Sequence, residues 1–132
     1  MARVRQAGAV TYEREGSEYR FLVVTSRRNP KAWIFPKGHV DEEETPEECA
    51  VRELREEAGV GGQVIDLLGS TSFKRDGKKF EVEYFLVRQT RKGSSKEGRQ
   101  LAWLSYPAAR ARLEYKGARK MLDRAARRLQ LL

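Results

Sequence analysis

The sequence predicts a single α/β domain covering residues 1–132. Three observations support this prediction: a strongly capped helix lies in the middle of the chain, strand-like segments flank it, and an amphipathic helix closes the chain. A length of 132 residues suits one domain with its own core. Charged residues make up 35% of the chain, but the apolar segments recur regularly, which is typical of a globular protein rather than a disordered one.

Three strand-like segments precede the central helix. Residues 3–13 and residues 18–25 are predicted to be strands, with a turn around Gly16 between them. These two segments form a hairpin or lie as neighbouring strands. A third, short apolar strand begins at Trp33 and leads directly into the loop before the helix.

The central helix is predicted to run from Pro46 to Ala58. Thr45 is a suitable N-cap, Pro46 suits the first helical position, and Glu48 completes a capping box. Gly59 ends the helix where a left-handed backbone is needed. The predicted apolar stripe consists of Ala50, Leu54 and Ala58, with Val51 on its flank.

The chain after the helix is predicted to return to strands and then to helices. Gly61 and Gly62 are expected to form a flexible exit, and Asp76-Gly77 is a hairpin signal. The expected strands are residues 63–73, 80–89 and 100–104, and the expected helices are residues 106–113 and 117–131. The second strand alternates, with Phe80, Val82, Tyr84 and Leu86 on one side and Glu81, Glu83, Phe85 and Val87 on the other. The expected core stripe of the last helix is Met121, Leu122, Ala125, Leu129 and Leu132.

Three carboxylates gather on a second side of the central helix. At about 100° per residue, Glu53, Glu56 and Glu57 fall within an arc of about 100°. Like charges at this spacing destabilise a helix, and Arg52 and Arg55 relieve only part of the repulsion. Hard divalent cations such as Mg²⁺ and Mn²⁺ take oxygen ligands and would relieve it. A solvated charged helix face is the alternative interpretation.

The residues on either side of the helix complete a longer pattern. Its fixed positions are Gly38, Glu44, Arg52, Glu53, Leu54, Glu56, Glu57, Gly59 and Val60. This pattern, over residues 38–60, resembles the Nudix box, the loop–helix–loop motif of hydrolases that cleave nucleoside diphosphates linked to another group. The resemblance implies an α/β/α sandwich with a mixed central sheet and a C-terminal helix. It also implies a pyrophosphohydrolase that uses Mg²⁺ or Mn²⁺.

The resemblance implies a ligand set for these metals. Glu53, Glu56 and Glu57 would provide carboxylate oxygens, and Gly38 would provide its carbonyl oxygen. Glu44 would bind a metal through water or support the loop.

The resemblance also implies catalytic roles. Arg52 would orient and neutralise a neighbouring glutamate, and Glu56 or Glu53 would accept the proton of the attacking water. Glu97, in the polar loop of residues 90–98, is a second candidate, with an ordinary loop charge as the alternative. The general base, the number of metals and the oligomeric state stay open.

Within the family, the chain most resembles the asymmetric diadenosine tetraphosphate hydrolases. The features that carry this resemblance are the segment 33–38, the loop around Glu97 and the segment 115–117. The resemblance implies that Tyr84 and Tyr115 stack on adenine and that Lys116 contacts phosphate, with ordinary packing as the alternative for both tyrosines.

A basic loop suggests further phosphate ligands. Arg27, Arg28 and Lys37 are candidates because cations bind polyanions well, with plain surface positions as the alternative. The loop 27–30 also resembles that of the diphosphoinositol polyphosphate phosphohydrolases, although the segment 36–39 is poorer in glycine than theirs. Nucleoside triphosphate and RNA 5′ pyrophosphohydrolases share the chemistry. A Nudix fold that only binds is a further alternative, which the clustered glutamates argue against.

The net charge of +8 is unevenly distributed. Residues 110–128 contain eight cations and two anions, which suits either a polyanionic substrate nearby or a solvated basic helix. No basic strand with interleaved aromatic residues and no helix-turn-helix pattern is present, so nucleic acid is expected only as an RNA 5′ end substrate, and the expected partner is a small nucleotide or polyphosphate.

The sequence also predicts a cytoplasmic location. Cys49 is the only cysteine and is expected to be a small, partly buried helix residue rather than a nucleophile. No apolar run approaches the length of a membrane span, and no signal peptide is recognised.

Overall fold

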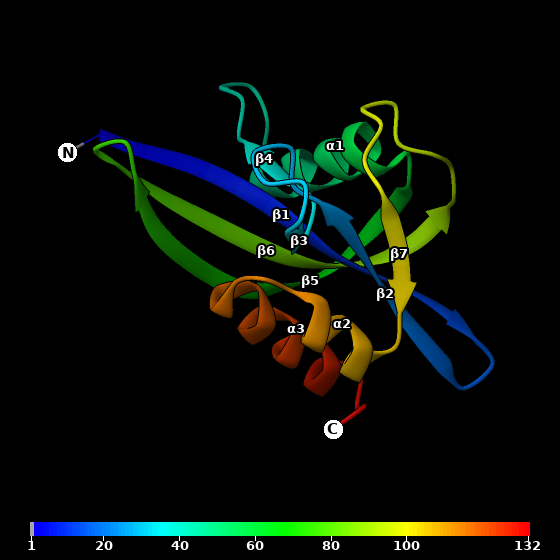
Figure 1. Ribbon diagram of the computed structural model, residues 1–132. Coiled ribbons are helices and arrows are strands. Elements are labelled where there is room, and N and C mark those ends of the chain that lie inside the picture. The colour runs from blue at the N-terminus through cyan, green and yellow to red at the C-terminus, as the bar shows by residue number, and fades with distance from the viewer. Residues whose placement is uncertain (1) are drawn as a thin grey trace.

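The computed structural model describes residues 2–132 and shows three layers (Figure 1). A mixed seven-stranded sheet forms the middle layer. Helix α1 (Pro46–Ala58) covers one face, and helices α2 (Tyr106–Arg112) and α3 (Lys116–Arg128) cover the other. The predicted α/β/α sandwich is confirmed. In residues 2–132, no helix is both long and apolar enough to cross a bilayer.

The sheet is built around one parallel pair of long strands. Its order is β3-β2-β1-β6-β5, with β4 paired to β1 and β7 paired to β2. Strands β1 and β6 run parallel over the register Ala2↔Lys78 to Tyr12↔Arg88, and the other pairs are antiparallel. The strands are β1 Ala2–Glu15, β2 Glu18–Thr25, β3 Trp33–Ile34, β4 Lys37–His39, β5 Gly61–Arg75, β6 Lys78–Arg91 and β7 Leu101–Leu104.

Alternation along β6 divides the apolar residues between two cores. Val82 and Leu86 face α3, where they pack with the buried Met121 and Leu122. On the opposite face, Phe85 and Val87 pack against α1 through the buried Leu54 and Ala58, together with the fully buried Cys49 and Ala50. The predicted stripe of the central helix is therefore buried. Because burial of apolar surface is the main favourable term in folding, this contact fixes the rotation of α1 and hence the direction of its carboxylates.

Both ends of α1 are held as the sequence predicts. The Thr45 side chain accepts a hydrogen bond from the Glu48 backbone at 3.1 Å, and Glu48 Oε1 accepts one from the Thr45 backbone at 2.9 Å. At the other end Gly59 is left-handed, with φ of 71°, and its N–H donates to the Arg55 carbonyl at 2.9 Å. A Cβ atom at Gly59 would overlap the backbone of Ser94, so the loop after β6 lies directly against the end of this helix.

The expected flexible exit at Gly61-Gly62 is wrong. Both glycines begin β5 and pair with Arg91 and Gln89 of β6. A Cβ atom at Gly62 would overlap Val87, so the missing side chain permits close strand contact here rather than flexibility. Gly69 lies within β5 beside a register shift. The hairpin at Asp76-Gly77 is confirmed, with φ of 51° and 73°.

The end of the last helix also differs from the prediction. Helix α3 ends at Arg128 rather than at residue 131, because Gln130 is left-handed with φ of 63° and turns the chain. Met121, Leu122 and Ala125 are fully buried and Leu129 packs against the same core. Leu132 is 63% exposed and does not belong to the core stripe.

Candidate active site

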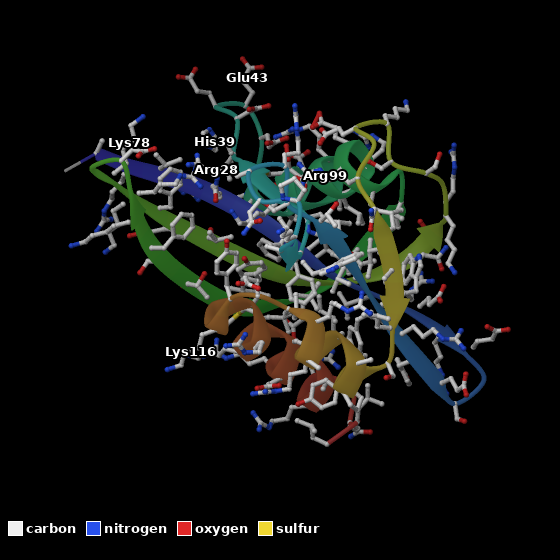
Figure 2. The ribbon with its side chains drawn as sticks, in the orientation of Figure 1. Arg28, His39, Glu43, Lys78, Arg99 and Lys116 are labelled. Carbon is white, nitrogen blue, oxygen red and sulfur yellow. The ribbon has the colours of Figure 1, made fainter. Side chains whose placement is uncertain are left out.

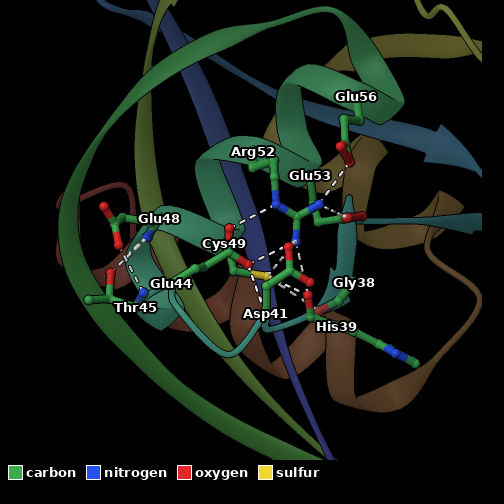
Figure 3. Close-up of polar contacts among 10 residues, drawn as sticks. All are labelled: Gly38, His39, Asp41, Glu44, Thr45, Glu48, Cys49, Arg52, Glu53 and Glu56. Carbon is green, nitrogen blue, oxygen red and sulfur yellow. Dashed lines mark hydrogen bonds and ion pairs between the residues drawn. The ribbon is translucent and has the colours of Figure 1, made fainter.

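One guanidinium organises the acidic residues of the box (Figure 3). Arg52 Nε and Nη2 each donate to the Glu44 carboxylate at 2.8 Å. Arg52 Nη1 donates to Glu53 at 2.8 Å and to Glu56 at 2.9 Å, and Nη2 also donates to the His39 carbonyl at 3.0 Å. The hydrogen bonds from Arg52 lower the pKa of Glu44 to about 2, so this carboxyl is charged at neutral pH.

The fourth glutamate of the box, Glu57, is buried. It is 2% exposed, and its Oε2 accepts a hydrogen bond from the Lys37 backbone N–H at 3.2 Å. Arg99 Nη1 lies 3.2 Å from Oε1, but this oxygen accepts no hydrogen bond from residues 2–132. The pKa of Glu57 is raised, first by burial and then by a hydrogen bond with the adjacent Glu53.

Gly38 lies against these carboxylates because it belongs to β4, which pairs with β1 opposite Ala7. A Cβ atom at Gly38 would overlap the Glu53 carboxylate, so glycine here leaves room for this carboxylate in its present position. The Cys49 thiol lies 3.5 Å from the Gly38 carbonyl and 3.3 Å from the next carbonyl. Burial raises the pKa of this thiol to about 12, which agrees with a structural rather than a nucleophilic residue.

The oxygen donors of this cluster fit a hard divalent cation. The buried Glu57 Oε1 is an acceptor without a hydrogen-bond donor in residues 2–132, and carboxylate oxygens are usual ligands of Mg²⁺. No three acidic, histidine or cysteine side chains of residues 2–132 are grouped so that they could hold a metal ion, and Glu56 accepts a hydrogen bond from Arg52. Glu53, Glu57 and the Gly38 carbonyl would hold the cation, and Glu56 would join them once it leaves Arg52.

A pocket of about 580 Å³ opens beside Glu57. Six cationic side chains and one carboxylate line it, a net formal charge of +5. The charged lining residues are Arg27, Arg28, Lys37, Lys74, Arg75, Arg99 and Glu57, and the aromatic ones are Phe35, Phe73, Tyr84 and Tyr115. A cavity with this charge favours a polyanionic ligand.

The predicted substrate residues differ in whether they line the pocket and in how exposed they are. Arg27 and Arg28 are exposed at the pocket rim, and Tyr115 is 53% exposed there. Tyr84 lines the pocket but is only 5% exposed, with its ring edge-on to Phe35 at 6.3 Å. Lys116 does not line the pocket, and its side chain points away from the body at the start of α3 (Figure 2).

Arg99 was not predicted as a site residue. Its side chain is 11% exposed, and its Nη1 donates to the Thr25 carbonyl at 3.1 Å while lying beside Glu57. Its Nε donates to Glu97 at 3.0 Å, so Glu97 is linked to the box through Arg99. In the sequence, Arg99 stands in a polar loop like any solvated cation, and only the pairing of Gln100 with Thr25 brings it to α1.

Of the cations predicted to bind substrate, Lys37 is the most buried. Its Nζ donates to Gln6 Oε1 at 3.2 Å and lies 5.2 Å from the centre of the Phe73 ring. Burial lowers the pKa of Lys37, and the positive charge of Arg75 lowers it further. Phe73 and Arg75 were not predicted as site residues.

Half of the cations in residues 110–128 hold the fold together. Arg110 pairs with Asp123 at 2.9 Å, and Arg128 pairs with Asp66 at 3.1 Å. Arg124 donates to the Leu68 carbonyl at 2.9 Å, and Arg119 donates to the carbonyls of Leu113 and Glu114. These contacts bind α3 to α2 and to β5, while the charge of the pocket comes from other segments.

A three-layer fold with a capped acidic helix at the edge of a cationic pocket defines the class of this protein. A family model described as NUDIX domain matches residues 2–125, and the chain belongs to this family. The resemblance seen in the sequence is thereby confirmed.

The similar proteins include members with two different names, an Ap4A hydrolase and diphosphoinositol polyphosphate phosphohydrolases. The chain is similar to an Ap4A hydrolase of C. elegans, solved as a binary complex, with a TM-score of 0.84, 25% identity and coverage of 98% of this chain and 99% of that one. It is 39% identical over 90 residues to a human diphosphoinositol polyphosphate phosphohydrolase, covering 58% of this chain and 50% of that protein. It is 45% identical over 65 residues to the 3-alpha form from Mus musculus, covering 49% and 40%. The chain spans about half the length of the curated relatives it matches.

Proposed function

We propose that this protein is a divalent-metal-dependent pyrophosphohydrolase that cleaves dinucleoside polyphosphates by water attack, giving ATP and a nucleotide. One observation carries the proposal: Glu57 of the acidic box also lines the pocket of charge +5. One carboxylate that would hold a metal and the cations that would hold phosphates therefore face the same cavity.

The box residues divide the work of hydrolysis. A bound Mg²⁺ or Mn²⁺ neutralises charge on the phosphoanhydride oxygens and activates water. Glu53, Glu57 and the Gly38 carbonyl would hold the metal, and the hydrogen bonds that Arg52 donates to Glu53 and Glu56 orient these two carboxylates. Glu56, which is 46% exposed, is our first choice for accepting the proton of the attacking water.

The remaining members of the box region have supporting roles. Glu44 accepts hydrogen bonds from Arg52 Nε and Nη2, one edge of the guanidinium, which supports a loop role for this residue. Glu97 is 29% exposed and bound to Arg99, so as an alternative base it would first have to release this partner.

The pocket supplies the substrate contacts. Arg27, Arg28 and Lys37 bind the phosphate chain, since charge-assisted hydrogen bonds to phosphate are strong. Tyr115 offers an exposed ring on which a base can stack, whereas the burial of Tyr84 favours ordinary packing for that ring. The similarity to the Ap4A hydrolase extends over nearly the whole length of both chains and supports this substrate class.

A diphosphoinositol polyphosphate is the second candidate substrate. The curated relatives described above carry that activity in their names, and the strongly cationic lining would suit a ligand with many phosphates. The exposed Tyr115 separates the two candidates, because an inositol has no aromatic base. Tyr115→Ala is expected to raise the KM for a dinucleotide and to leave that for a diphosphoinositol unchanged.

A substrate panel tests the proposal. Purified protein with Mg²⁺ is offered dinucleoside polyphosphates, nucleoside triphosphates, nucleotide sugars, 5′-triphosphorylated RNA and diphosphoinositols, with products read by chromatography. We expect the dinucleoside polyphosphates to be preferred and ATP to appear. A clear preference for diphosphoinositols would overturn the first choice.

A matched pair of variants tests the roles within the box. Glu56→Gln is expected to lower turnover by several orders of magnitude and largely to keep polyphosphate binding. Glu43→Gln removes the same charge from the exposed loop before α1 (Figure 2) and is expected to leave turnover unchanged. Unchanged hydrolysis in Glu56→Gln would reject the assigned role.

A further inference from the structure

Arg75 at the end of β5 is a pocket cation held by aromatic rings instead of by a carboxylate. Its guanidinium lies 4.5 Å from the centre of the Phe80 ring and 5.6 Å from that of Phe73. The two rings are opposite each other in the β5–β6 register and stack at 4.8 Å with an interplanar angle of 4°. No carboxylate of residues 2–132 forms an ion pair with Arg75.

A second cation shares this aromatic pair. Lys37 Nζ lies 5.2 Å from the centre of the Phe73 ring, and its hydrogen-bond acceptor, Gln6, is neutral. Arg52 and Arg99, by contrast, are paired with glutamates. An aromatic face holds a cation in place but leaves its N–H groups unused. Two like charges that lie over one aromatic pair without a carboxylate partner suit a bound anion, and this place is called the anion site below.

The place of this anion site in the pocket follows from Lys37. Its backbone N–H donates to Glu57, whereas its Nζ lies at Phe73. The length of one lysine side chain therefore separates the box carboxylate from the aromatic pair, and both ends face the same cavity. An anion at Arg75 would lie beyond the phosphate that is next to Glu57.

We propose that Arg75 is a specificity-determining residue that binds a phosphate group remote from the one attacked by water, so that the pocket selects chains of three or more phosphates. The remote position rests on the proposed function, because that function places the attacked phosphate at the box. The planar guanidinium suits bidentate contact with phosphate, which an ammonium group does not make.

Calorimetry with inorganic anions tests the anion site directly. Tripolyphosphate and pyrophosphate are titrated with Mg²⁺ into the Glu56→Gln protein, with and without Arg75→Gln, Arg75→Lys or Lys78→Gln. Lys78 lies near the outer tip of the same β5–β6 hairpin and does not line the pocket (Figure 2). Lys78→Gln is therefore a control for net charge.

Arg75→Gln is expected to weaken tripolyphosphate binding about tenfold or more, the loss that follows removal of a hydrogen bond to a charged group, and to change pyrophosphate binding less than about threefold. Arg75→Lys is expected to lie between, and Lys78→Gln to match the parent. An equal loss for both anions, or an equal effect of Lys78→Gln, would overturn the proposal.

Hydrolysis separates this proposal from the proposed function. In the active protein, Arg75→Gln is expected to raise the KM for dinucleoside tetraphosphates about tenfold with kcat unchanged, and to spare dinucleoside diphosphates. If the parent protein hydrolyses no member of the panel, the proposed function fails while the calorimetry still decides for or against the anion site. A fall in kcat without a change in KM would overturn the role of Arg75.

Discussion

Replacing Arg52 tests whether one guanidinium holds the acidic box together. Arg52→Gln removes charge-assisted hydrogen bonds to Glu44, Glu53 and Glu56, at 2.8 to 2.9 Å. The side chains of Glu44 and Glu53 are only 14% and 15% exposed, so solvent replaces the lost partner poorly. Leaving partly buried charges unpaired costs about 3 kcal/mol. At roughly 2.1 cal/mol/K per residue, the unfolding entropy of 132 residues converts this into a fall in Tm of about 10 °C.

The pH dependence of this loss identifies its origin. The pKa of Glu44 is lowered to about 2 by the hydrogen bonds from Arg52, so the folded state binds fewer protons than the unfolded state above that value. The stabilisation is present above the ordinary pKa of about 4.5 and disappears as the pH falls toward 2. The difference between Arg52→Gln and the parent is therefore expected to be large at pH 7 and to shrink below pH 4.5.

Urea denaturation of the metal-free protein at pH 7 and pH 3.5 measures both effects. Arg55→Gln is the matched control, because Arg55 lies on the same helix and forms no ion pair with a side chain of residues 2–132. We expect this control to lose less than about 0.5 kcal/mol. An equal loss in both variants, or a loss for Arg52→Gln that is the same at both pH values, would refute the ionic origin of the stabilisation.

Two further predictions concern neighbours of the same cluster. Gly38→Ala places a Cβ atom on the Glu53 carboxylate, the movable end of a side chain, so we expect a stability loss below about 1 kcal/mol but at least about a tenfold loss of kcat. The control is Gly61→Ala, where a Cβ atom meets only ordinary contacts. Full activity of Gly38→Ala would contradict the metal-site geometry. The pKa of Glu57 is raised, so above the ordinary pKa of about 4.5 the folded state binds more protons than the unfolded state. The metal-free protein is therefore expected to lose stability as the pH rises, by up to about 1.4 kcal/mol per pH unit. Denaturation is measured between pH 5 and pH 9. Stability should depend less on pH for Glu57→Gln in EDTA, and for the parent in Mg²⁺ without EDTA, than for the parent in EDTA. Parallel profiles would argue against a protonated Glu57.

The sequence predicts the parts of this molecule that depend on neighbours along the chain. The limits of α1 follow from Thr45, Glu48 and Gly59, since capping is a contact within a few residues. The hairpin at Asp76-Gly77 follows for the same reason. The glycines at the start of β5 misled the prediction, because a glycine that permits close packing and one that permits flexibility look identical in a sequence.

Contacts between distant segments stay hidden in the sequence. The pattern of the box places Glu57 among three exposed acids, whereas packing of α1 on the sheet makes it the buried one. Arg99 reaches this carboxylate only because β7 pairs with β2, and no local signal marks it out from the other cations of its loop. Phe73 ends the predicted strand 63–73 and Arg75 lies beyond it, and only the pairing of β5 with β6 places Phe80 opposite Phe73.

The division of charge gives a reason for the separate positions of the box and the basic residues. Arg52 and Arg99 form ion pairs with glutamates of the box, so their positive charge is balanced by these carboxylates. Arg27, Arg28 and Arg75 have no acidic partner in the part of the chain that the structure describes, so their charge remains available to the pocket. A polyphosphate would therefore be attracted to the pocket by unpaired cations and would lie beside the buried Glu57, whose Oε1 has no hydrogen-bond donor in residues 2–132 and could bind a cation.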